Sequence, residues 1–152
     1  MPSSVTHDIF TKTKNDSAKL RDLAQIDTGT IFRCQSVFPI DFFPDTLVVN
    51  SNKISVTTRF SFFSKQVHSL LISDVLTAIV EEGIFFATLR VVDRQFNQET
   101  ITVEHLFKSD AKRARRLIEG LVIATKEKID FSKIPTGELK TMLEKIGQTK
   151  TN

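Results

Sequence analysis

Apolar and polar residues alternate through the middle of the chain, and this alternation is the strongest pattern in the sequence. Across residues 53–63, Ile54, Val56, Thr58, Phe60 and Phe62 alternate with polar or charged residues. A period of two residues predicts strands that turn one face toward a core. With polar or glycine breaks between them, about seven strands are expected over residues 31–37, 46–49, 53–63, 66–72, 75–82, 86–92 and 100–106. The short turns indicate an antiparallel meander, folded as a sandwich or barrel.

The pattern changes to a helical period after Leu106. Ser109 is expected to be the N-cap of a helix that runs to about residue 128. An amphipathic helix needs an apolar surface to cover, and an open end of the sheet would supply it. The apolar arc comprises Ala111, Ala114, Leu117, Ile118, Leu121, Val122 and Thr125, while Lys112, Arg113 and Arg116 lie opposite, with Arg115 at the border.

The regions on either side of this pattern differ from it. Residues 1–30 are expected to be a polar tail with a short helix at about 16–26, and residues 31–128 the domain itself. Residues 129–152 are expected to be a linker and a second, short helix. The apolar face of that helix is a candidate surface for self-association, and it comprises Leu139, Met142, Leu143 and Ile146.

Residues 38–45 interrupt the meander, because Pro39 and Pro44 prevent regular ladder pairing. The segment is nevertheless strongly apolar, and an exposed loop of this composition would be a liability. We therefore expect it to lie against the sheet and to cover an edge or an open end. The alternative is a hook that binds a partner. Its apolar residues are Phe38, Ile40, Phe42 and Phe43.

The aromatic content is restricted to phenylalanine, with 13 Phe and neither Trp nor Tyr. Phe adds apolar area without a hydrogen-bonding group, so this composition predicts a core filled with Phe rather than a Tyr- and Trp-rich interface. The single cysteine, Cys34, excludes an internal disulfide and fits a reducing compartment. No secretory leader and no membrane-spanning run is visible, so we expect a cytoplasmic location.

Three segments resemble bacterial pleckstrin-homology-like (PH-like) domains. Residues 59–75 (RFSFFSKQVHSLLISDV) resemble the central hairpin, 83–91 (GIFFATLRV) the glycine-then-strand element that follows, and 111–121 the closing helix. The likeness covers residues 42–128 and lacks the tryptophan of eukaryotic closing helices. It implies a mainly β fold, an antiparallel PH-like barrel or sandwich of about seven strands capped by a C-terminal amphipathic helix.

Positive charge is concentrated on the predicted long helix. The net charge of the chain is +3, and residues 108–128 hold seven basic and three acidic residues. Lys112, Arg113 and Arg116 are therefore candidates for binding an anion, against the simpler interpretation of a solvated helix face. The PH-like resemblance adds Lys53 and Arg59, because lipid-binding members carry basic residues around the first hairpin. Thr57 occupies the intermediate basic position of that pattern.

No motif indicates catalysis. The sequence has no phosphate-binding glycine loop, nucleophile elbow or HExxH motif, and His7, His68 and His105 are too scattered to indicate a metal site. We expect a non-enzymatic binding or scaffolding module without metal or cofactor, whose partner is another protein or a second copy. The leading alternative is peripheral binding to anionic lipid, at the inner face of the membrane, through residues 112–116. Nucleic acid is less favoured, because no aromatic residues interleave the basic ones.

Overall fold

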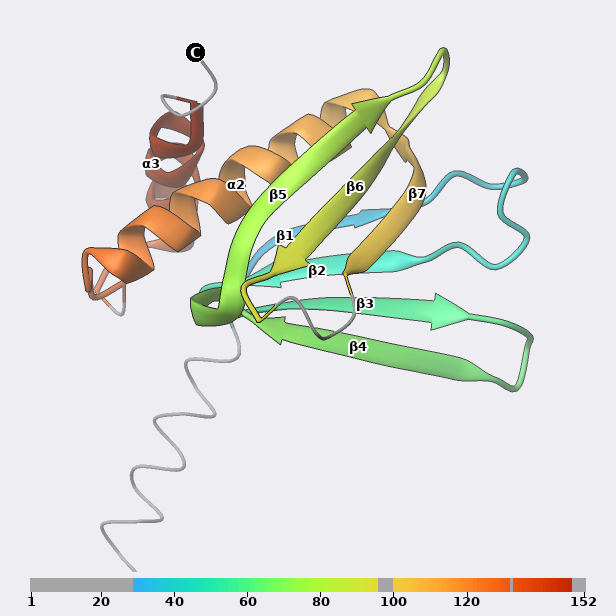
Figure 1. Cartoon of the computed structure of the whole chain (residues 1–152), viewed down its shortest axis with the longest axis horizontal. Helices are drawn as coiled ribbons and strands as arrows, with labels where there is room; N and C mark the ends of the chain where they lie inside the picture. The colour runs from blue at the N-terminus through green and yellow to red at the C-terminus, as the bar shows by residue number, and fades with distance from the viewer. Residues whose placement is uncertain (1–28, 96–99, 132, 149–152) are drawn as a thin grey trace, which may run out of the picture.

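The computed structural model describes residues 29–95, 100–131 and 133–148, which form two antiparallel sheets and two C-terminal helices (Figure 1). The predicted mainly β class is confirmed. The predicted N-terminal helix lies outside the described residues. The first sheet has the order β1 (Thr30–Gln35), β2 (Thr46–Asn50), β3 (Lys53–Arg59), β4 (Lys65–Leu71). The second has the order β5 (Val75–Glu82), β6 (Phe86–Asp93), β7 (Ile101–Phe107), followed by α2 (Lys108–Lys126) and α3 (Thr136–Gln148).

The alternating residues of the first sheet turn one face to the core, as the sequence pattern predicts. Leu47 pairs with Val56, and Val49 with Ile54, and all four side chains are buried. The third strand is shorter than predicted and ends at Arg59. The chain turns there because the Phe60 N–H donates to the Ser64 carbonyl at 3.1 Å.

The two sheets do not close into a barrel, so the barrel form of the prediction is wrong. No strand pairing joins the sheets within the described residues. After β4 the chain turns through the short 3-10 helix η1 (Ile72–Asp74), and β5 then begins the second sheet instead of pairing beside β4. At the other side, the Val37 N–H, two residues beyond β1, donates to the His105 carbonyl of β7 at 2.9 Å.

Helix α2 covers the apolar side of the sheets and runs alongside β5 (Figure 1). Its predicted apolar arc is buried from Ala111 to Val122. The predicted N-cap is wrong by two residues, because the helix begins at Lys108. Phe107 holds the cap position and makes no side-chain cap hydrogen bond.

Helix α3 folds back onto α2, and glycine permits the close approach. A methyl group built at Gly120 would overlap the Leu143 carbonyl, and one at Gly147 would overlap the Arg116 carbonyl. Leu139 and Leu143 are consequently buried in the same core as the sheets.

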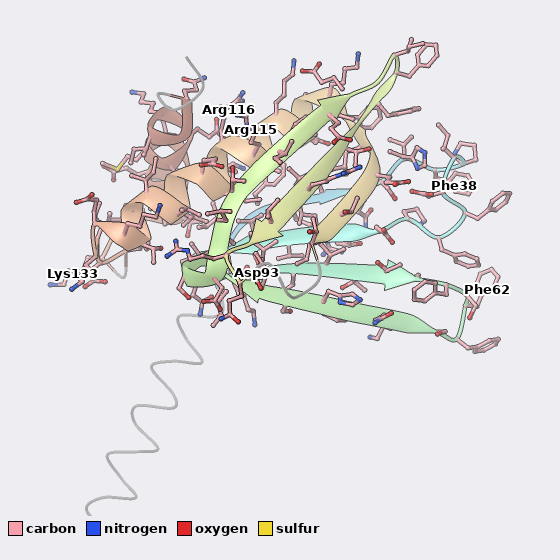
Figure 2. All side chains as sticks on the ribbon, viewed as in Figure 1. Phe38, Phe62, Asp93, Arg115, Arg116 and Lys133 are labelled. Carbon is pink, nitrogen blue, oxygen red and sulfur yellow. The ribbon has the colours of Figure 1, made fainter. Side chains whose placement is uncertain are left out.

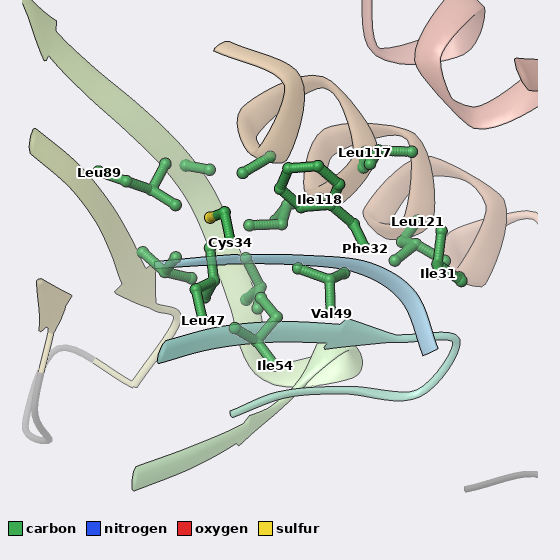
Figure 3. Close-up of a cluster of buried hydrophobic side chains, with 14 of the residues drawn as sticks. Ile31, Phe32, Cys34, Leu47, Val49, Ile54, Leu89, Leu117, Ile118 and Leu121 are labelled. Carbon is green, nitrogen blue, oxygen red and sulfur yellow. The ribbon is translucent and has the colours of Figure 1, made fainter. Parts of the chain in front are cut away.

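The core is aliphatic rather than aromatic, which corrects the expectation of a Phe-filled interior. Figure 3 shows Leu47, Val49 and Ile54 of the first sheet facing Leu117, Ile118 and Leu121 of α2. Phe32 is the one buried phenylalanine among the described residues. The exposed ones are Phe38, Phe42, Phe60, Phe62, Phe63, Phe85 and Phe107. Packing in the core therefore does not account for most of the phenylalanines in the sequence.

Candidate binding surface

The β1–β2 connection, residues 36–45, projects from the sheet instead of covering it. Two hydrogen bonds close its base: Asp45 N–H donates to Ser36 Oγ at 2.8 Å, and Ser36 N–H donates to the Asp45 carbonyl at 3.0 Å. Beyond this base, Phe38, Ile40 and Phe42 are exposed, Phe42 to 78%. The expectation that the segment lies against the sheet is therefore wrong.

The β3–β4 connection, residues 60–64, is the most exposed apolar point of the described structure. The Phe62 side chain is 91% exposed and that of Phe63 is fully exposed. Ser61 orders the turn, because its Oγ accepts hydrogen bonds from the N–H groups of Phe63 at 3.3 Å and Ser64 at 3.1 Å. The two phenylalanines are thus held outward by a hydrogen-bonded turn.

The β5–β6 connection, residues 83–85, repeats this arrangement. The Gly83 N–H donates to the Phe86 carbonyl at 2.8 Å, which closes the turn. Ile84 and Phe85, between these two residues, are 86% and 78% exposed. At its base Phe86 stacks at a tilt on Phe107 of β7, with ring centroids 6.3 Å apart.

Direct contacts bring these connections together. The rings of Phe43 and Phe62 meet edge to face at 5.4 Å, which joins the first two connections. His105 joins the first to the β5–β6 hairpin: its Nδ1 lies 3.4 Å from Asp41 Oδ2, and its ring meets that of Phe86 edge to face at 6.4 Å.

All three connections lie on the side of the molecule away from α3, where Phe38 and Phe62 point outward (Figures 1 and 2). We call this surface the phenylalanine edge. It comprises Phe38, Ile40, Phe42, Phe60, Phe62, Phe63, Ile84 and Phe85.

An open hollow of about 500 Å³ lies between the first two connections. Phe42, Phe43 and Pro44 line one side of it, and the β3–β4 turn lines the other. Arg59 and Lys65 also line it, and they sit directly opposite each other in the β3–β4 ladder. Two like charges in this position repel each other. The hollow therefore combines phenylalanine rings with a pair of cations.

Two glutamates beside the β5–β6 connection are engaged in ion pairs. Glu81 lies 3.3 Å from Arg90, and Glu82 lies 3.0 Å from Lys112. Burial raises the pKa of the Asp45 carboxyl above its ordinary value of 3.8, although a hydrogen bond from the Thr58 side chain acts in the opposite direction. Arg59 and Lys65, by contrast, form no ion pair with another described residue.

The structure does not gather the basic residues predicted to bind an anion into one site. Lys53 and Arg59 stand at opposite ends of β3, so about 20 Å of extended chain separates them. Lys112 pairs with Glu82, and Arg113 Nε lies 2.6 Å from Glu144 Oε1 of α3.

Arg115 and Arg116 are half-buried on α2, away from Phe38 and Phe62 (Figure 2). The Nε of each is buried without a hydrogen-bond partner among the described residues. Arg59 is therefore the one predicted anion-binding residue that lies in the hollow at the phenylalanine edge.

The predicted association surface of the C-terminal helix is largely internal. Leu139 and Leu143 are buried against the domain, Ile146 is half-buried, and Met142 is 47% exposed. A role of this helix in self-association stays a prediction, and Met142 is the most exposed of these four residues.

Cys34 is buried in the hydrophobic core (Figure 3). Burial, with a smaller contribution from the negative charge of Asp110, raises the pKa of its thiol from 9.0 to about 12. A thiol held protonated is a poor nucleophile. Over the described ranges, no three His, Cys, Asp or Glu residues come together as a metal-binding group. Neither described helix is both long and apolar enough to cross a bilayer.

Comparisons of the chain with protein-family models, curated proteins and solved structures found no match. The candidate surface therefore rests on the geometry of this molecule. Sequence reasoning offered the 38–45 segment as an alternative partner-binding hook. It missed the β3–β4 part of the surface because the alternation of residues 53–63 predicts a strand through Phe60 and Phe62. The available signal was the adjacent pair Phe62–Phe63, which breaks the alternation, flanked by the turn-forming residues Ser61 and Ser64.

Proposed function

We propose that this protein is a non-enzymatic binding module of PH-like fold, and that the phenylalanine edge is its binding surface. The PH-like part of the proposal is supported by the resemblance of three sequence segments and by the element order. A four-stranded antiparallel meander, a three-stranded meander and a covering helix follow one another along the chain.

The observation that carries the proposal is the outward projection of large apolar side chains from three hairpin connections at one side of the molecule. Phe63 is fully exposed, and Phe62 remains 91% exposed although its ring meets that of Phe43. Clustered exposed apolar groups lower solubility, and in stable proteins they mark places where a partner binds. The turns that present them are closed by hydrogen bonds, so the exposure is a property of ordered backbone.

The edge is compatible with both partner classes expected from the sequence. A protein partner or a second copy would bury the rings in an apolar interface. Anionic lipid, the alternative, would receive them in its acyl region. The same surface serves both, so the proposal is first tested without assuming the partner.

Site-specific photocrosslinking in living cells makes this test. A benzophenone amino acid replaces Phe62, and a control replaces Lys133, which is exposed between α2 and α3 away from the edge (Figure 2). We expect light-dependent adducts, with protein or with lipid, from position 62 and few from position 133. Equal adduct yields from the two positions would contradict the edge as the binding surface.

A further inference from the structure

We propose that the partner of the phenylalanine edge is an anionic lipid bilayer, into which the β3–β4 turn inserts Phe62 and Phe63. This inference rests on the proposed function, because it names the partner of the same surface. It moves the expected lipid contact away from Lys112, Arg113 and Arg116 on α2. It assigns the electrostatic role to Arg59 and Lys65 instead.

The shape of the edge favours a bilayer over a folded protein. The exposed rings stand on three separate turns, so a protein partner would have to provide a pocket for each of them. A hydrocarbon layer receives separate protrusions without shape complementarity. Phe62 and Phe63 are also 91% and fully exposed, so their insertion requires no rearrangement of the core.

The backbone of the inserting turn is prepared for an apolar medium. A backbone N–H that loses water must find another acceptor, because an unpaired one is costly in lipid. In this turn Phe60 N–H and Ser61 N–H donate to the Ser64 carbonyl at 3.1 and 3.4 Å. Phe63 N–H and Ser64 N–H donate to Ser61 Oγ. Four of the five backbone N–H donors of residues 60–64 are therefore satisfied internally, and that of Phe62 is the exception among them.

The charges at the base of the turn complement an anionic headgroup layer. Arg59 and Lys65 face each other across the ladder and have no ion pair with other described residues. A lipid phosphate or carboxylate beside them would relieve their mutual repulsion. Of the acids beside the β5–β6 connection, Glu81 and Glu82 would repel the membrane less strongly because they are paired with Arg90 and Lys112.

Sedimentation of the full-length protein with vesicles tests this inference. One set of vesicles contains phosphatidylserine in phosphatidylcholine, and the other contains phosphatidylcholine alone. Three double variants are compared: Phe62→Ser with Phe63→Ser, Arg59→Glu with Lys65→Glu, and Arg113→Glu with Arg116→Glu. Met142→Ser is the matched control for loss of an exposed apolar side chain. Circular dichroism checks that each variant is folded.

We expect the wild type and Met142→Ser to sediment with the anionic vesicles, and the serine double variant to bind about tenfold more weakly or worse. Arg59→Glu with Lys65→Glu should lose binding as well, and neutral vesicles should bind less wild-type protein than anionic vesicles do. The inference fails if no protein sediments with anionic vesicles. It also fails if Phe62→Ser with Phe63→Ser leaves vesicle binding unchanged. A third contradicting result is that Arg113→Glu with Arg116→Glu abolishes binding while Arg59→Glu with Lys65→Glu does not.

These outcomes are separable from those of the proposed function. Protein adducts from position 62 in cells, together with no vesicle binding, would leave the edge as the binding surface and assign it a protein partner. If position 62 forms no adducts in cells, and Phe62→Ser with Phe63→Ser leaves vesicle binding unchanged, both proposals are wrong.

Discussion

Glu119 of α2 accepts two hydrogen bonds from β5: its Oε1 lies 2.9 Å from the Ala78 backbone N and 2.8 Å from Thr77 Oγ1. The side chain of Glu119 is buried. The ladder between β5 and β6 also shifts register between Val75 and Thr77. The carboxylate therefore supplies an acceptor to the open side of an edge strand, next to the point where its register shifts, and it ties α2 to the sheet.

Replacing Glu119 tests this connection. Glu119→Ala leaves the Ala78 N–H buried without this acceptor, so we expect the free energy of unfolding to fall by about 2 kcal/mol. Glu119→Gln retains an amide oxygen that can accept from the same groups, and it should cost less. Urea denaturation of the three proteins gives the comparison. A smaller loss for the alanine variant than for the glutamine variant would contradict the role of this acceptor.

Gly120 and Gly147 should be the least replaceable residues of the helix pair. Either Gly120→Ala or Gly147→Ala forces the α2 and α3 backbones apart, and we expect each to lower the free energy of unfolding by about 1–3 kcal/mol. Gly137→Ala is the matched control in α3. A methyl group built there meets nothing within 4 Å beyond its own helix backbone and chain neighbours, and alanine favours helix.

Thermal denaturation of these variants measures the effect. The double variant of Gly120 and Gly147 should lose less than the sum of the single losses, because one separation of the helices accommodates both methyl groups. If neither single variant nor the control changes the melting temperature, the α2 and α3 backbones do not approach closely at Gly120 and Gly147.

The buried thiol predicts a specific pH dependence. Because the folded-state pKa of Cys34 is raised to about 12 from 9.0, the folded protein holds the proton more tightly than the unfolded chain. The contribution of the protonated thiol to the free energy of unfolding is fully present below pH 9. It is lost as the pH rises toward 12, at up to about 1.4 kcal/mol per pH unit.

The comparison with Cys34→Ala isolates this contribution. Between pH 8.5 and 10.5, the free energy of unfolding of the wild type should fall more steeply than that of the variant, as measured by urea titration. Parallel slopes would contradict a thiol that stays protonated in the core. Disulfide-exchange labelling at pH 8 should likewise be slow until urea unfolds the protein.

The sequence alone predicts the strands and α2 because both depend on local periodicity. Leu47, Val49, Ile54 and Val56 are buried as their alternation indicates. The open sheet arrangement was not predictable in this way, since it depends on how η1 redirects the chain after β4.

The candidate surface was harder to predict from sequence, because apolar periodicity does not distinguish an inward-facing ring from one beyond the end of a strand. Phe60 and Phe62 continue the pattern of β3 and yet lie in the turn. Likewise, the role of Glu119 depends on the contact between α2 and β5, which are far apart in the sequence.

Fluorescence of Phe63→Trp tests the membrane contact most directly, because the chain contains no Trp and the new residue is therefore the sole indole. With anionic vesicles we predict a blue-shifted emission and quenching by brominated acyl chains, whereas Met142→Trp, on α3, keeps the emission of a water-exposed indole. An unshifted emission from position 63, or equal quenching at both positions, would contradict the insertion of the phenylalanine edge.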